Sequence, residues 1–396
     1  MKQQKIISAL TLVPFLAVIF GLGAGLWLLP KKSFSADENR LLQAFPTITL
    51  QALTDGELSE DFNAYYADHL PLRRGLIGIN AAASLALGRG ESNGVLASKE
   101  GQLAVRKFDA YISLTERARD TDYFDPDHIV RGVEALGHMA RSADLPLTYL
   151  PAPRTVDVVT SAFAYPSALS DELRQTLMTA ADTAGVDTLD LTPALRAAHD
   201  RGEYVYYRTD HHWTTLGAYT AYTALMIHWG MAENILPPEA FTIRRVENFY
   251  GTTWSRAGLF GQIPPDTLEL WEMPDDKTFA LRDKDGRLIQ NGFIDESFLT
   301  AKDKYGAFLS GTRQVLTISQ EGADAAPTKP RLLIARDSFA SALAPFLARH
   351  FDLVLVNLSG GMTHLSAYAR EYGCDRILVV CNLENAVTSD CLLRVD

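Results

Sequence analysis

The hydrophobic pattern begins with a long apolar run at the start of the chain. Residues 6–30 carry no charged side chain, lysines lie on both sides of them, and no clear small-x-small cleavage site precedes the second lysine pair. About 20 apolar residues are enough to cross a bilayer, whereas the apolar core of a cleaved signal peptide is about 7–15 residues long. We predict a transmembrane anchor over 6–30, a short cytoplasmic tail over 1–5, and export of the rest.

Residues 31–108 have the pattern of a membrane-proximal helical segment. The stretch LSEDFNAYYADHL places apolar and aromatic side chains at helical spacing until Pro71 ends the pattern. GLIGINAAASLALGRG predicts a second helix, rich in small residues and ended by glycine. Neither stretch carries an obvious catalytic group, so we interpret both as packing elements.

From residue 109 onward, apolar runs alternate with helical stretches. A helix over 127–143 precedes LPLTYLPAP, and the order later resumes with RLLIA, LVLVN and RILVVCNL, separated by helices. This alternation predicts β–α–β units and a parallel sheet. The strands are apolar almost throughout, which is typical of a sheet covered on both faces. The predicted core covers 109–236 and 326–396.

Residues 237–325 interrupt this order. They contain short alternating runs such as KDGRLIQNGFI and AFLSGTRQVLTI, broken by Asp-Gly and Ser-Gly. Such runs are typical of hairpins. We therefore predict a β-rich insertion over these residues.

Composition excludes one class of partner and leaves the cysteines open. The net charge is −11 and no basic patch stands out, which argues against nucleic-acid binding. The three cysteines, Cys374, Cys381 and Cys391, lie close together near the end of the chain. Two of them could pair, or all could be buried thiols. They do not resemble a zinc site, and we expect no metal or other cofactor.

The stretch TDHHWTTLGAY, residues 209–219, holds the first candidate chemistry. In an extended chain Asp210 and His212 share a face, while His211 points away and is predicted to be structural. A metal pair on a helix would need i, i+4 spacing. An aspartate beside a histidine fixes the tautomer of a catalytic imidazole. Spacing favours an acid–base pair, and metal ligation or a helix cap remain as alternatives.

A candidate nucleophile lies in IARDSFASALAPFL. An apolar strand ends there, Ser338 follows in a turn, and a helix begins. The carboxyl edge of a parallel sheet is where α/β proteins build their sites. A backbone N–H at a helix N-terminus is suited to an oxyanion. The alternative is a simple helix cap.

Together the two stretches resemble the DHHW proteins and the alginate O-acetyltransferase family, which belong to the SGNH hydrolase-like superfamily. ENRLLQAFP, FNAYYADHLPLR, FYGTTWSRAG and YGAFLSGTRQVLTI support the resemblance. It implies an SGNH hydrolase-like fold, a flavodoxin-like three-layer α/β/α architecture. The block order is permuted, because the Asp/His block precedes the serine block.

The resemblance also implies an activity. Ser338 would be the nucleophile, His212 its base, and Asp210 the group that orients the base. The chain would then be an extracytoplasmic, membrane-anchored O-acetyltransferase or acetylesterase. It would act on a cell-surface or secreted polysaccharide through an acetyl-serine, with a membrane-bound O-acyltransferase partner supplying acetyl groups. Two alternatives stay open: an inactive glycan-binding or scaffold protein of an export complex, and a metal-dependent hydrolase using Asp210, His211 and His212.

Strand order within the family implies further site residues. Gly360 or Gly361 and Asn382 would complete an oxyanion hole with the Ser338 N–H. Two departures from the family pattern keep the inactive alternative open. Arg336 stands where glycine is more usual before the Asp-Ser pair, which makes it a candidate anion-binding residue. Residues 357–359 read Asn-Leu-Ser in place of an Asp-x-Arg-like element.

The remaining candidates concern substrate binding. Tyr207, Trp213 and Trp254 could stack on sugar rings, or could pack in the core as aromatic side chains commonly do. Arg154 follows the first strand of the predicted sheet and should therefore lie near its carboxyl edge. It could bind an acidic sugar or only a surface carboxylate.

Overall fold

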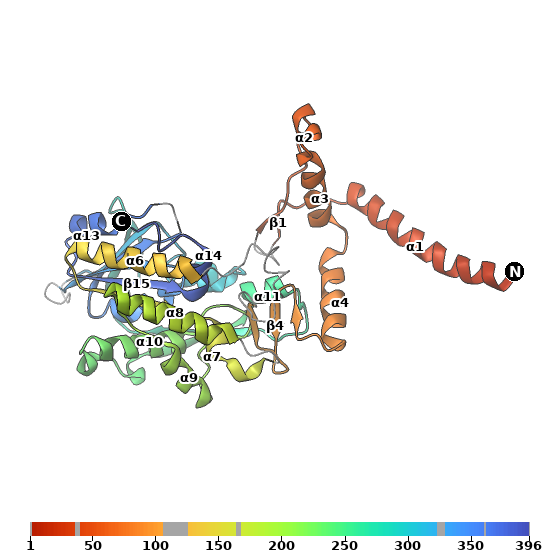
Figure 1. Ribbon diagram of the computed structural model, residues 1–396. Helices are drawn as coiled ribbons and strands as arrows, with labels where there is room; N and C mark the ends of the chain where they lie inside the picture. The colour runs from red at the N-terminus through yellow and green to blue at the C-terminus, as the bar shows by residue number, and fades with distance from the viewer. Residues whose placement is uncertain are drawn as a thin grey trace.

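The computed structural model describes residues 2–35, 40–105, 126–163, 168–322, 329–359 and 362–395. A central sheet organises the larger part of the molecule (Figure 1). Its strands are β6 (Leu147–Ala152), β7 (Asp187–Thr188), β10 (Phe279–Asp283), β11 (Leu288–Asn291), β12 (Val315–Gln320), β13 (Arg331–Arg336), β14 (Asp352–Asn357) and β15 (Arg376–Asn382). They lie in the order β11-β10-β12-β14-β13-β15-β6-β7.

The predicted parallel sheet forms one side of this arrangement. From β14 through β13, β15 and β6 to β7, each strand runs parallel to its neighbour. β13 lies between β14 and β15, and only its first residue is not fully buried. Because the strands are parallel, the loops that follow them meet at one edge of the sheet.

Helices cover both faces of the sheet, and the alternation of side chains along β13 separates the two cores. Leu333 faces a core formed with α6 (Pro126–Ala143), α8 (Ala168–Ala184), α13 (Leu365–Tyr372) and α14 (Leu383–Thr388). Ile334 faces the other core, formed with α7 (Thr155–Val158), α9 (Thr192–Asp200), α10 (Thr215–His228) and α12 (Ala340–Leu347). The molecule is therefore a mixed α/β protein with three layers.

Residues 237–325 divide into two parts. The first part is a two-stranded antiparallel sheet of β8 (Thr242–Phe249) and β9 (Asp266–Glu272), with α11 (Thr252–Ala257) between the strands. The second part extends the central sheet. β12 pairs antiparallel with β14, β10 with β12, and β11 with β10.

The membrane-proximal part comprises α1 (Lys2–Leu28), α2 (Leu50–Thr54), α3 (Glu57–His69), α4 (Arg73–Ala86), the pair β1 (Phe34–Ser35) and β2 (Arg40–Leu41), and the sheet of β3 (Glu91–Ser92), β4 (Val95–Ala97) and β5 (Leu103–Val105). Within α1, Leu10–Leu28 is long and apolar enough, by length and composition, to cross a membrane. The helix projects away from the rest of the molecule (Figure 1).

Candidate active site

The loop that carries the histidines is held by contacts with distant segments. The backbone N–H and the hydroxyl of Thr209 donate to Asp266 Oδ2 at 2.8 and 2.6 Å. The carbonyl of Thr209 accepts the backbone N–H of Trp254 at 2.8 Å. At the far end of the loop, Trp213 is fully buried and donates its indole N–H to the Phe339 carbonyl at 3.1 Å. The loop is thereby joined to the turn after β13.

Asp210 is buried and accepts hydrogen bonds at both oxygens. Oδ1 accepts the His212 Nδ1–H at 2.5 Å and the His212 backbone N–H at 3.0 Å. Oδ2 accepts the N–H and the hydroxyl of Thr252 at 2.8 and 3.0 Å. A Cβ on Gly251 would lie 2.2 Å from the Asp210 Cβ, so only glycine allows this approach. Asp210 is therefore fixed from two sides.

The charge of Asp210 follows from these partners. Burial alone would raise the pKa of Asp210, but His211, His212 and the Thr252 N–H hold that pKa well below its usual range. Asp210 is thus a carboxylate, which can only accept hydrogen bonds. The proton between the two residues must lie on His212 Nδ1.

His212 connects Asp210 to Ser338. With a proton on Nδ1, a neutral imidazole has its lone pair on Nε2, which lies 2.7 Å from Ser338 Oγ and accepts the hydroxyl proton. The Tyr305 ring stacks on the imidazole with centroids 3.8 Å apart and planes 7° apart. Hydrogen bonds at both nitrogens and this stacking together fix the orientation of the ring. This series of hydrogen bonds allows His212 to withdraw a proton from the Ser338 hydroxyl.

Ser338 lies in the turn between β13 and α12, and Asp337 holds this turn. The Asp337 carboxyl accepts the Phe339 N–H at 3.0 Å, the Asn382 N–H at 2.6 Å and the Asn385 side-chain amide at 2.9 Å. Burial raises the pKa of Asp337, although these donors oppose the shift. Ser338 itself is only partly buried, and its hydroxyl lies against His212.

His211 does not point away from the site, and this corrects the expectation from strand alternation. Residues 208–212 form a bend, so the two-residue period of a strand does not apply. The His211 ring lies beside His212 with centroids 3.8 Å apart. Its Nδ1 is 2.7 Å from the Thr252 hydroxyl, which donates to Asp210. His211 therefore donates into the same hydrogen-bond network.

The three residues of the metal-dependent alternative lie close together. Asp210, His211 and His212 each offer an atom within 4.8 Å of the others. However, both ring nitrogens of His212 are engaged with Asp210 and Ser338. A metal would displace one of these hydrogen bonds.

Arg154 lies close to the site but its side chain is held inside the protein. It is buried, and Nε and one terminal nitrogen donate to the two oxygens of Asp157 at 3.0 and 2.8 Å. With His211 and Asn382 it lines a small cavity of about 20 Å³. The main partner of Arg154 is therefore a carboxylate, as one of the two alternatives expected, but this carboxylate is buried and not on the surface.

The three aromatic candidates are core residues. Tyr207, Trp213 and Trp254 are at most 4% exposed, so none offers a free ring face to a sugar. Lys302 and Tyr250 cover the Trp254 ring. The expectation of sugar stacking is corrected in favour of packing, because these rings hold the histidine loop in place.

Arg336 is likewise not a surface residue. It is fully buried and donates to the Ser341 hydroxyl at 2.9 Å, while Nε and one terminal nitrogen have no partner among the described residues. Burial lowers its pKa to about 10. Strand alternation turns Arg336 inward toward α12, where its side chain is enclosed, and this corrects the expectation that Arg336 binds an anion of the substrate.

The predicted oxyanion residues divide into two groups. Gly360 and Gly361 lie outside the described residues. Asn382 caps α14: its side-chain oxygen accepts the Glu384 N–H at 2.9 Å, and its side-chain amide donates to the Ala152 carbonyl at 3.2 Å. The Asn382 amide thus joins β15 to β6 at the carboxyl edge.

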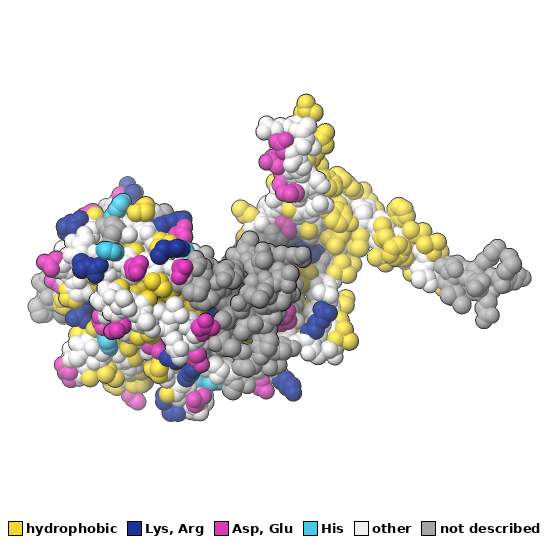
Figure 2. Space-filling view, viewed as in Figure 1, with side chains coloured by type: hydrophobic (Ala, Val, Ile, Leu, Met, Phe, Trp, Pro, Cys, Tyr) yellow, Lys and Arg dark blue, Asp and Glu magenta, His cyan; other side chains and the backbone are white. Residues whose placement is uncertain are grey.

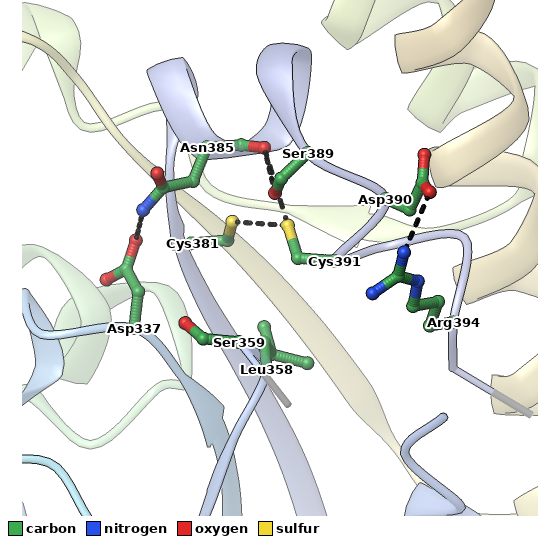
Figure 3. Close-up of a pocket in the computed structure, with 9 residues that line it drawn as sticks. All are labelled: Asp337, Leu358, Ser359, Cys381, Asn385, Ser389, Asp390, Cys391 and Arg394. Atoms are coloured by element: carbon green, nitrogen blue, oxygen red, sulfur yellow. Dashed lines mark hydrogen bonds and ion pairs between the residues drawn. The ribbon is translucent and has the colours of Figure 1, made fainter. Parts of the chain in front are cut away.

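A larger cavity of about 370 Å³ lies beside the nucleophile turn (Figure 3). Asp337 forms part of its wall, together with Asn385 from α14 and Ser359 from the loop after β14. Asp390 and Arg394 also line it and are joined by an ion pair of 3.1 Å. Polar side chains therefore surround a space next to Asp337.

Several residues of the site have no individual signal in the sequence. Thr252, Tyr305 and Asn385 each bind or stack on a predicted residue. Thr252 and Tyr305 lie in FYGTTW and YGAF, within stretches that carry the family resemblance. Asn385 lies in no such stretch, and only the fold brings it to Asp337.

Comparison with known proteins confirms the predicted resemblance. Residues 186–357 match the model of the DHHW protein family. This range contains Asp210, His212 and Ser338. The chain is also 32% identical over 168 residues to "Probable alginate O-acetylase AlgJ" of Pseudomonas aeruginosa. That alignment covers 42% of this chain and 41% of the relative, so the chain spans about two fifths of the relative's length.

Two solved structures share the fold. A DHHW family protein from Eubacterium siraeum superposes with a TM-score of 0.59 at 19% identity, covering 76% of this chain and 96% of that one. Bacillus cereus PatB1, in a structure with a sulfonyl adduct, superposes with a TM-score of 0.57 at 15% identity, covering 76% and 100%. At these identities the likeness concerns the fold.

Proposed function

We propose that this chain is a membrane-anchored, extracytoplasmic O-acetyltransferase or acetylesterase that acts on a polysaccharide through Ser338. The observation that carries the proposal is the chain of hydrogen bonds from Asp210 through His212 to the Ser338 hydroxyl, at 2.5 and 2.7 Å. Nucleophile, base and orienting carboxylate have the mutual geometry of a serine-hydrolase triad.

In the proposed reaction, His212 Nε2 takes the Ser338 proton as Oγ attacks an acetyl carbonyl. The negatively charged Asp210 stabilises the imidazolium that forms. His212 then gives the proton to the leaving group, and the acetyl group remains on Ser338. In the second half, His212 deprotonates a sugar hydroxyl or a water, which attacks the acetyl-serine and regenerates the free hydroxyl.

The comparisons support the acyl group and the acceptor class. One relative is named as an alginate O-acetylase, and one structural neighbour carries a sulfonyl adduct. A polysaccharide acceptor is consistent with the polar cavity beside the nucleophile turn. Acetyl supply by a membrane-bound O-acyltransferase partner belongs to the same proposal.

The sheet order supports an SGNH hydrolase-like fold with permuted blocks. If the parallel strands are counted from β13 through β14 and β15 and then on to β6 and β7, their spatial order is 2-1-3-4-5. That is the flavodoxin-like order, in which ligands bind where neighbouring connections diverge at the carboxyl edge. Ser338 follows β13, at that point.

The proposed anchor is supported by contacts at the base of α1. Pro71 lies against Gly25, where a Cβ would be 2.8 Å from the proline ring, and Trp27 packs edge-on against Phe45. Just beyond Pro71, α4 exposes an apolar face. Exposed apolar side chains lie within the helix and at its two ends: Leu76 and Ile79 within it, Leu72 before it and Leu87 after it. Figure 2 shows apolar side chains over this part of the molecule, consistent with a surface that lies toward a bilayer.

The test uses the full chain in detergent. It should release p-nitrophenol from p-nitrophenyl acetate, and Ser338→Ala should reduce release to background. Ser59→Ala, the same change on an exposed face of α3, is the matched control and should retain full activity. Full activity in the Ser338→Ala variant would refute the proposed nucleophile.

The metal-dependent alternative is favoured by the three ligand atoms within 4.8 Å. Treatment with a chelator distinguishes the two mechanisms. Loss of acetyl release in chelator, restored by zinc, would favour a metal hydrolase. Unchanged activity in chelator with loss in Ser338→Ala would favour the serine mechanism.

A further inference from the structure

We infer that Cys381 and Cys391 form a disulfide bond when the protein is exported, and that this bond fixes the support of the nucleophile turn. Their sulfur atoms lie 3.3 Å apart, and both side chains are buried. Figure 3 shows the two sulfurs pointing toward one another at the wall of the larger cavity. The inference rests on the proposed function in one respect only: an exported protein lies in an oxidising environment, where disulfide bonds persist.

The geometry requires a small movement. A disulfide has an S–S distance of about 2.03–2.05 Å, so the sulfurs need to approach by about 1.3 Å. Cys381 is the second-last residue of β15 and is held in the sheet, whereas Cys391 follows α14, outside regular structure. Rotation of the Cys391 side chain beside the cavity can supply most of this movement.

The bond would close a loop that contains two of the three donors to Asp337. Cys381 precedes Asn382, and Cys391 follows α14, so the loop includes the Asn382 N–H and the Asn385 side-chain amide. Both donate to the Asp337 carboxyl next to Ser338. A covalent link across this loop therefore restricts α14 and holds Asp337, and thereby the turn. A bond here positions the nucleophile without touching substrate.

The chemistry is a thiol–disulfide exchange with an external disulfide, either glutathione disulfide or a dithiol–disulfide oxidoreductase. The Cys381 S–H can donate to the Cys391 sulfur, and this hydrogen bond lowers the pKa of Cys391. The Cys391 thiolate attacks the external disulfide and releases one thiolate. Cys381 then loses its proton and displaces the second thiolate from Cys391. Two protein thiols are oxidised, one external disulfide is reduced, and both protons pass to the released thiols.

The third cysteine serves as the internal reference. Cys374 is buried after α13, and no described sulfur bonds to it. Oxidised protein should therefore keep one thiol that can be alkylated after denaturation, and reduced protein should show three. Trypsin leaves Cys381 and Cys391 in the single peptide 377–394. In the oxidised protein this peptide should be lighter by two hydrogen atoms and carry no alkyl group.

The experiment treats the full chain in detergent with glutathione disulfide, and analyses in parallel protein isolated from an oxidising compartment. Cys374→Ser should still form the bridge, whereas Cys391→Ser should not. The oxidised protein should melt at a higher temperature than the reduced one, and this difference should vanish only in Cys391→Ser. Alkylation of both Cys381 and Cys391 in both preparations would overturn the inference. A bridged protein without acetyl release would overturn only the proposed function.

Discussion

The turn that carries Ser338 and the helix α4 use apolar and polar residues in opposite ways. Around Ser338, charged and polar side chains are buried and held by partners from distant parts of the chain. In α4, apolar side chains are instead exposed, with Leu76 at 41% and Ile79 at 68%. Burial of the polar groups is offset by their hydrogen bonds. The exposed apolar stripe has no comparable partners among the described residues.

The two faces of α4 sharpen the contrast. Gly78 and Ala81 are buried, and Gly78 faces the backbone of 258–260. The opposite face, with Leu76 and Ile79, has open surroundings. One helix therefore packs against residues 258–260 on one side and presents an apolar surface on the other. The core is explained by contacts within the chain, whereas the stripe implies contacts outside it.

The largest expected effect concerns the polar centre. His212→Ala removes the only described base in contact with Ser338 Oγ. We expect the rate of acetyl release to fall about 10⁴-fold or more. Steady-state kinetics on p-nitrophenyl acetate measure the change, and the melting temperature serves as the folding control. If the rate of acetyl release falls by less than tenfold in a folded variant, His212 is not the catalytic base.

Asp210→Asn should reduce acetyl release by about 10⁴-fold, because an amide no longer fixes the imidazole tautomer. The same variant tests the charge. Because the pKa of Asp210 is held low in the folded protein, its stabilising effect is fully present above the unfolded value of about 3.9 and is lost as pH falls below it. The difference in unfolding free energy between wild type and variant should shrink below about pH 4, with a slope approaching about 1.4 kcal/mol per pH unit. A difference that stays constant from about pH 5 to pH 3 would contradict the lowered pKa.

Trp213→Ala tests whether the predicted sugar-binding tryptophan is a core residue. Removing a fully buried indole that bonds the Phe339 carbonyl should cost about 3–5 kcal/mol of folding stability. Thermal unfolding in detergent measures the loss. An unchanged melting temperature combined with a raised KM for a glycan acceptor would restore the stacking role.

The smallest effect is expected on the exposed stripe. Leu76→Ser combined with Ile79→Ser should change stability in detergent by no more than about 0.5 kcal/mol per substitution, because neither side chain is buried. On the opposite face, Ala81→Leu is the matched test of packing and should cost about 1–3 kcal/mol. Thermal unfolding of both variants makes the comparison. A large loss in the serine variant would mean that the stripe packs within the chain.

The sequence indicates the parts of the site that depend on local order. Asp210 and His212 are two residues apart, and this spacing predicts that they act together. Ser338 follows an apolar strand, and the hydrophobic pattern therefore predicts its position at the edge of the sheet. Thr252 and Asn385 contact their partners from 42 and 48 residues away. Such contacts depend on the packed fold and not on a local period.

The orientation of His211 could not be predicted for a related reason. Alternation assumes an extended strand, but the loop bends, and contacts with Asp266 and Trp254 determine its path. The same limit applies to 279–320. Their hairpin pattern predicts strands, but not that β12 pairs with β14 and extends the central sheet.

The most direct test of the central claim is the site and rate of covalent labelling by a serine-reactive fluorophosphonate. The full chain in detergent is labelled, digested with trypsin and analysed by mass spectrometry for the peptide 337–349, which contains Ser338 and Ser341. One adduct is expected, on Ser338, and it should form far more slowly in His212→Ala. Labelling at another serine, or equal rates in the two proteins, would contradict this expectation.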